Sequence, residues 1–61
     1  MKLTLKQWRR LKDITQEELA ERTGVSVTTI WAWENGTMPS GRNLQIVANA
    51  LEVSADDIIL P

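Results

Sequence analysis

The chain has 61 residues, of which 43% are hydrophobic and 25% are charged, a composition typical of one small globular domain spanning residues 1–61. It contains no cysteine and no histidine, which excludes disulfide bonds and the usual zinc sites and leaves most nucleophilic and metal-dependent enzyme mechanisms without their residues. Seven basic and eight acidic residues give a net charge of −1, so the chain as a whole lacks the positive charge typical of indiscriminate nucleic-acid binding.

The first predicted helix covers residues 5–12 and follows Thr4. The T-x-x-Q pattern from Thr4 to Gln7 has the form of a capping box, in which both side chains accept hydrogen bonds from backbone N–H groups at the start of a helix. We expect Ile14, beyond the end of this helix, to pack in the core. Three apolar residues about one turn apart form the expected inner face of the helix: Leu5, Trp8 and Leu11.

The second predicted helix covers residues 16–23 and opens with another capping box, the T-x-x-E pattern from Thr15 to Glu18. Two acidic residues in its first turn suit the positive end of the helix dipole. Gly24 follows the helix and supplies a left-handed exit, because glycine adopts a positive φ at little steric cost.

The third predicted helix covers residues 27–35, with Ser26 as its cap and Gly36 at its end. Only a few residues, one of them a glycine, separate it from the preceding helix. A connection of this length and composition is typical of a helix-turn-helix, which we place at about residues 15–36.

The fourth predicted helix begins after Ser40, because Pro39 bars the third helix from continuing. The S-x-x-D pattern from Ser54 to Asp57 predicts a fifth, short helical turn. No run of alternating apolar and polar residues is long enough to predict a strand, so we expect an all-α fold of five helices. The inner face of the fourth helix carries apolar residues at helical spacing: Leu44, Val47, Ala48 and Leu51.

Several short motifs occur in a fixed order between the second helix and the last turn. Together they make the chain resemble the phage-repressor, Cro and xenobiotic-response-element-like regulators, from about Leu5 to Ile59. The resemblance implies a compact lambda-repressor-like domain that binds double-stranded operator DNA, usually as a homodimer, with the third helix in the major groove. The residues that carry it are Thr15, Gln16, Leu19, Ala20, Gly24, Val25, Ser26, Ile30, Trp33, Glu34, Asn35, Gly36, Pro39, Ala50, Leu51, Val53 and Ser54.

The side of the third helix opposite Ile30 is the expected base-reading face, since successive residues turn by roughly 100° and Ile30 faces the core. None of its residues can form the bidentate pairs by which arginine reads guanine or asparagine reads adenine. Specificity should therefore depend on thymine methyl groups, DNA shape and water. Alternatively, Thr28 and Thr29 are ordinary exposed residues and Val27 is partly buried. The expected base-reading residues are Val27, Thr28, Trp31 and Ala32.

The phosphate contacts are expected on either side of the third helix. Gln16 starts the second helix, where free N–H groups can meet an anion, and the family uses this glutamine at the DNA. Arg42 is the one cation near the start of the fourth helix, although it can equally be a solvated side chain. The expected backbone contacts are Gln16, Ser26, Thr29, Thr37, Ser40 and Arg42.

Four residues are interpreted as structural: Arg9, Glu34, Trp33 and Ile30. The resemblance implies that Arg9 and Glu34 pair across the first and third helices. Trp33 belongs to the W-E-N-G motif and faces inward, whereas Trp31 stands where the family usually has a small polar residue. Trp31 therefore either lies in the groove or belongs to a protein interface, where tryptophan is favoured.

The leading hypothesis is a sequence-specific, non-enzymatic DNA-binding regulator, of the phage or prophage repressor type, without cofactor, metal or small-molecule ligand. The alternative is a protein-interaction module on the same fold, antirepressor-like or antitoxin-like, which Trp31 and the acidic balance favour. A homodimer would use the apolar end, Ile58, Ile59 and Leu60, unless two of these fill the core and one is merely exposed. No membrane span or signal peptide is predicted, so we expect a cytoplasmic protein.

Overall fold

The computed structural model describes residues 1–61, and each of its four α-helices begins directly after a serine or threonine. The hydroxyl of each of these residues accepts a hydrogen bond from a backbone N–H in the first helical turn. Both predicted capping boxes, at Thr4 and Thr15, are confirmed. The helices are α1 (Leu5–Leu11), α2 (Gln16–Thr23), α3 (Val27–Glu34) and α4 (Gly41–Leu51).

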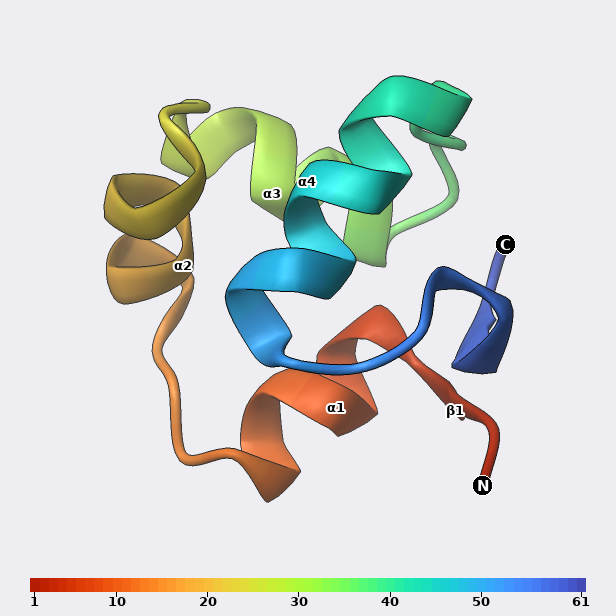
Figure 1. Ribbon diagram of the computed structural model, residues 1–61. Helices are drawn as coiled ribbons and strands as arrows, with labels where there is room; N and C mark the ends of the chain where they lie inside the picture. Colours follow the sequence, from red (N-terminus) through yellow and green to blue (C-terminus); the bar gives the residue numbers. More distant parts are fainter.

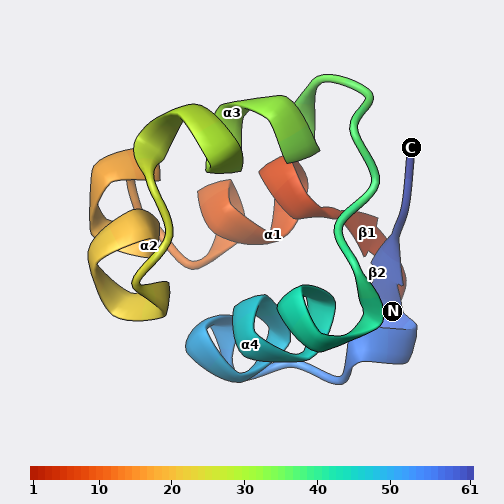
Figure 2. The same ribbon diagram turned by 90° about the horizontal axis from the view of Figure 1, so that it is seen from above.

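The predicted fifth helix is not confirmed as an α-helix, because Ala55–Asp57 forms a single 3-10 turn. The chain also contains two strands of two residues each, β1 (Leu3–Thr4) and β2 (Ile58–Ile59), which pair in parallel near the two termini (Figures 1 and 2). The prediction of a fold without strands was therefore wrong in this detail. Two residues are too few to show an alternating pattern in the sequence, and the pairing depends on α1 and α4 bringing the two ends together.

The core consists of eleven apolar side chains contributed by the four α-helices, by Ile14 between α1 and α2, and by β2. Trp8 of α1 is buried in it, and its indole nitrogen Nε1 donates a hydrogen bond of 2.8 Å to the backbone oxygen of Asp57. This bond joins the first helix to the last turn of the chain. The largest fully buried side chains are Leu19, Ile30, Leu51 and Val47.

The predicted inner face of α1 was wrong at Leu11, which is 58% exposed. The helix ends at this residue, and Asp13 reverses the chain with a φ of 58°. The N–H of Ile14 then donates to the backbone oxygen of Arg9 at 2.9 Å, the reversal typical of a Schellman motif. Ile14 therefore takes the buried place at the end of α1, as predicted, and Leu11 remains outside.

The pair α2 and α3 forms the helix-turn-helix, with Gly24 at its turn in the left-handed conformation (φ 78°). The N–H of Gly24 closes α2 by donating to the oxygen of Ala20 at 2.9 Å. Helix α2 packs against both α3 and α4. In Figure 2, α3 lies along the upper edge of the molecule, and its side chains Val27 and Trp31 are exposed to solvent.

Candidate nucleic-acid interface

The open side of α3 is largely apolar and carries no exposed charge. Ile30 and Trp33 are buried against the core, whereas Trp31 is 56% and Val27 is 39% exposed. Thr28 is exposed beside them, and Ala32 is half-buried. The structure thus brings Val27, Thr28 and Trp31 together on the outward face, with Ala32 only at its edge.

The carboxylate of Glu34, at the end of α3, is the centre of a network that joins three helices. Arg9 of α1 donates to it twice, from Nε to Oε2 at 2.7 Å and from Nη2 to Oε1 at 3.2 Å. Gln16 of α2 donates from Nε2 to Oε1 at 3.0 Å. The Glu34 side chain is 1% exposed and that of Arg9 is 12% exposed, so little solvent reaches the pair.

The network also fixes the charge and direction of Arg9. Its hydrogen bond with Glu34 raises the pKa of the guanidinium above its ordinary value, against an opposing effect of burial. A further hydrogen bond, from Nη1 to the backbone oxygen of Ile14 at 3.0 Å, ties the same side chain to the segment before α2. Arg9 therefore holds the start of α2 and the end of α3 relative to α1 and is not available to a ligand through these donors.

The sequence predicts a phosphate contact for Gln16 and gives no indication of its hydrogen bond to Glu34. Gln16 is half-buried, and one of its amide hydrogens is directed at Glu34. The residue still starts α2, where the first N–H groups have no acceptor within the helix. No local pattern joins residues 16 and 34, so only the packing of α2 on α3 reveals the contact.

Two polar side chains near the outward face of α3 are turned back onto the protein. Thr29 Oγ1 lies 2.8 Å from Ser26 Oγ, which itself accepts the N–H of Thr29 at 3.1 Å. Asn35 donates from Nδ2 to the backbone oxygen of Trp31 at 2.8 Å. Asparagine side chains commonly bond nearby backbone groups, so Asn35 near the end of a helix is itself a sequence signal for this second contact.

The loop between α3 and α4 carries the remaining predicted backbone contacts. Thr37 is exposed, and its N–H donates to the oxygen of Ala32 at 2.9 Å. Ser40 caps α4 by accepting the N–H of Asn43 at 3.2 Å. Arg42 is exposed in the first turn of α4 and has no ion-pair partner.

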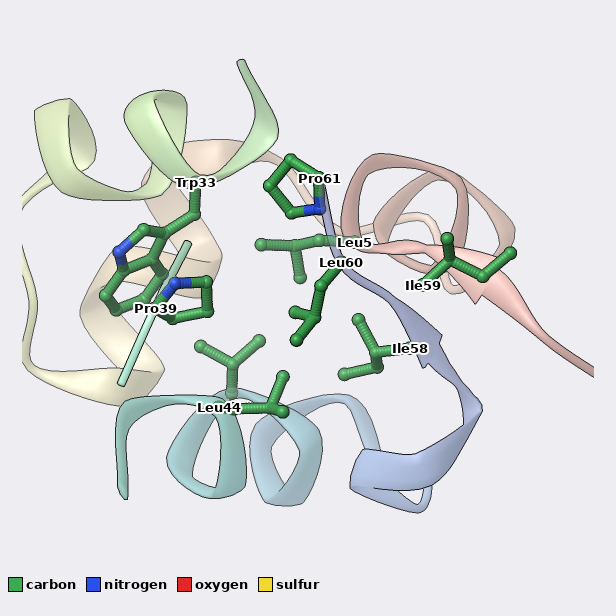
Figure 3. A pocket seen from close by; sticks show the side chains of 9 residues that line it. Leu5, Trp33, Pro39, Leu44, Ile58, Ile59, Leu60 and Pro61 are labelled. Carbon is green, nitrogen blue, oxygen red and sulfur yellow. The ribbon is translucent and has the colours of Figure 1, made fainter. Parts of the chain in front are cut away.

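The apolar C-terminal end lines an apolar hollow together with Leu5, Trp33 of α3, Pro39 and Leu44 (Figure 3). Ile58 is buried, so its assignment to a possible dimer surface was wrong. Neighbouring side chains of a strand point to opposite faces, and β2 places Ile58 inward and Ile59 outward. Leu60 is directed toward Leu44 and Ile58 across the hollow, whereas Ile59 points away from it.

The capped helices α2 and α3, the tight turn at Gly24 and the exposed side of α3 define a helix-turn-helix protein. A model of the helix-turn-helix family matches residues 5–58, and the chain belongs to this family, of the Cro/C1 type, which confirms the resemblance found in the sequence. None of its helices is both long and apolar enough to cross a bilayer.

Two curated relatives and one solved structure are similar to the chain. It is 36% identical over 58 residues to YazB, an uncharacterized HTH-type transcriptional regulator of Bacillus subtilis (strain 168), covering 93% of this chain and 84% of YazB. It is 38% identical over 56 residues to BcrR, an HTH-type transcriptional activator of Enterococcus faecalis, covering 90% of this chain but 28% of BcrR. The crystal structure of SinR, the master regulator for biofilm formation, in complex with DNA matches with a TM-score of 0.79 and 35% identity, covering 85% of this chain and 86% of that chain.

Proposed function

We propose that the protein is a transcriptional regulator that binds double-stranded operator DNA and places α3 in the major groove. The observation that carries the proposal is the open face of α3, which the network at Glu34 holds rigidly against α1 and α2. The likeness to SinR, whose structure was determined in complex with DNA, supports it. Val27, Thr28 and Trp31 meet the bases, with Ala32 at the edge of the contact.

The proposed function includes an oligomeric state and an effect on transcription. We infer that the protein acts as a repressor of the phage or prophage type and binds its operator as a homodimer. The motifs between Thr15 and Ser54 support both inferences. The exposed apolar side chain of Ile59, which points away from the hollow, supports an interface between two copies at the C-terminal end.

Phosphate groups on either side of the groove are held by the segments that flank α3. At the start of α2, the free N–H groups and the second amide hydrogen of Gln16 attract one phosphate, because a helix N-terminus carries partial positive charge. At the start of α4, Arg42 supplies the one full positive charge of this part of the surface. The remaining contacts come from the hydroxyl groups of Ser26, Thr29, Thr37 and Ser40.

A protein-interaction module on the same fold is the second candidate, and two observations favour it. Trp31 exposes 56% of its surface, and tryptophan is among the residues that contribute most to protein interfaces. The net charge of −1 is also unusual for a protein that binds a polyanion. An antirepressor-like or antitoxin-like partner would cover the same face of α3.

Selection of sites from random duplex DNA at low salt tests the proposed function. We expect an enriched sequence whose affinity falls with salt, with a slope in log K against log salt of about −0.9 for each phosphate neutralised. Replacing Arg42 by alanine should reduce the magnitude of the slope by about one unit, whereas Lys12→Ala, a control at the end of α1, should leave it unchanged. If no duplex shows salt-dependent affinity, the regulator function is wrong.

Tryptophan fluorescence distinguishes DNA from a protein partner at the same face. Trp8 and Trp33 are buried, so acrylamide quenching reports mainly on Trp31. Selected DNA should protect Trp31 from quenching, and the protection should disappear in Trp31→Phe. If the protein binds DNA and acrylamide still quenches Trp31 fully, this face does not contact the DNA and is available to a protein partner.

A further inference from the structure

We propose that α3 recognises its operator chiefly through the C5-methyl groups of pyrimidines in the major groove, contacted by Val27, the methyl group of Thr28 and the indole of Trp31. This inference rests on the proposed function and specifies what the same face reads. The ligand is a duplex whose contacted positions carry thymine.

Hydrogen bonding from this face cannot identify a base pair. Asn35 is the one amide side chain beside it, and its Nδ2 donates to the oxygen of Trp31 at 2.8 Å, which directs the amide along its own helix. Thr29 is similarly held by Ser26 at 2.8 Å. No arginine or lysine lies within α3 to read guanine.

Two side chains of the outward face make no side-chain hydrogen bond within the protein, and they offer the hydroxyl of Thr28 and the indole N–H of Trp31. A hydroxyl both donates and accepts, so it satisfies every base edge in the major groove. A single N–H donor meets an acceptor on guanine, adenine and thymine alike. Neither group therefore distinguishes one base pair from the others.

Apolar contact, in contrast, is available over most of the face. Val27 is 39% and Trp31 is 56% exposed, and the two lie one helical turn apart with Thr28 between them. The C5-methyl of thymine is the apolar group that a B-form major groove presents. A flat indole is large enough to cover such a group at low conformational cost, and burying it removes apolar surface from water on both partners.

Exchange of thymine for deoxyuridine in the selected duplex tests this inference, since it removes the methyl group and leaves every hydrogen-bonding group of the base in place. We expect each contacted thymine to lose roughly four-fold in affinity, the equivalent of one buried carbon group. The measurement is a titration of the full chain with each singly substituted duplex at constant salt. Equal affinity for thymine and uracil at every position would overturn the inference.

Protein variants assign the methyl contacts to residues. In Trp31→Ala and Val27→Ala, the loss caused by uracil should shrink at the positions that each side chain covers. Leu11→Ala removes a comparably exposed apolar side chain from the end of α1 and should leave every uracil effect unchanged. Undiminished uracil effects in both α3 variants would place the methyl contacts on other residues and overturn the inference.

The same titrations separate this inference from the proposed function. Binding of the selected thymine duplex, with its salt dependence, is measured first and depends only on the proposed function. If that duplex binds and uracil has no effect, the methyl readout alone is wrong. If no duplex binds at all, both are wrong.

Discussion

Gln16, the first residue of α2, and Glu34, the last residue of α3, are joined by a hydrogen bond of 3.0 Å between the glutamine amide and the glutamate carboxylate. The same carboxylate accepts two hydrogen bonds from Arg9 of α1. The orientation of α3 relative to α1 and α2 is therefore set by polar contacts at its C-terminal end as well as by the packing of Ile30 and Trp33 in the core. A rigidly held helix presents its outward residues without an entropic cost of ordering upon binding.

Arg9→Ala should destabilise the fold strongly, because it leaves the carboxylate of Glu34, which is 1% exposed, without its counter-charge. Loss of one partner from a buried ion pair typically costs about 3 to 5 kcal/mol, and the lower end applies here because Arg9 retains some exposure. Urea denaturation followed by circular dichroism measures the change. Arg10→Ala, a control on the exposed side of the same helix, should alter stability by no more than about 0.5 kcal/mol.

Gln16→Ala should destabilise the protein less than Arg9→Ala and weaken DNA binding beyond what the lost stability explains. A hydrogen bond to a charged group contributes about 1.5 to 3 kcal/mol to folding. The variant also removes the amide group that the proposed function assigns to a phosphate. Affinity measured well below the unfolding temperature separates the two effects, and an unchanged affinity in the folded variant would assign Gln16 a purely structural role.

The contribution of Arg9 to stability should not vary with pH around neutrality. Its pKa is raised in the folded state, so the stabilisation is fully present below the unfolded pKa, which lies far above neutrality, and is lost only as the pH rises through the folded pKa. The difference in unfolding free energy between the wild type and Arg9→Ala should therefore be constant from about pH 6 to pH 9. A decline within this interval would show that another group titrates with the network.

Local features of the fold could be read from the sequence, and contacts between distant segments could not. The capping boxes at Thr4 and Thr15 depend on residues three apart, and Gly24 needs only its own conformational freedom, so all three were predicted correctly. The pairing of Leu3 with Ile58 depends on the whole core being assembled. For this reason a short parallel pair of strands was missed.

In the candidate site, too, local features were predictable from the sequence and contacts between distant segments were not. Helical periodicity correctly separated the buried Trp33 from the exposed Trp31, because one angle per residue decides which side faces the core. The partner of Gln16 was not predictable in this way. Its amide meets Glu34 only because the packing of α2 on α3 brings the start of one helix to the end of the other, and the sequence spacing of the two residues does not indicate this.

Glu52→Gly should stabilise the protein. Glu52 ends α4 in the left-handed conformation with a φ of 60°, where a side chain costs about 1 to 2 kcal/mol and glycine is the preferred residue. For a domain of this size, a gain of about 1 kcal/mol corresponds to a rise in Tm of roughly 4 to 8 °C. The control Glu21→Gly, on the exposed side of α2 with ordinary helical geometry, should lower stability by about 1 kcal/mol instead.

Ile59→Lys should abolish self-association while preserving the fold, if the C-terminal end forms the proposed interface between two copies. Ile59 is 47% exposed and points away from the hollow beside it, so a charged side chain reaches solvent in the monomer. In a dimer, the same charge would be buried beside its symmetry mate, because a two-fold interface places each patch against its own copy. Sedimentation equilibrium measures the association, and circular dichroism checks the fold.

The matched variant Lys2→Ile adds an apolar side chain of the same kind directly before β1, next to the strand that pairs with Ile59. It should leave the monomer intact and either strengthen the association or have no effect. If Ile59→Lys associates as tightly as the wild type, the apolar end is not the interface. Ile59→Lys should also bind a symmetric operator more weakly than the wild type and bind an isolated half-site equally well. This result would show that the interface contributes to DNA recognition, because only a dimer binds both half-sites at once.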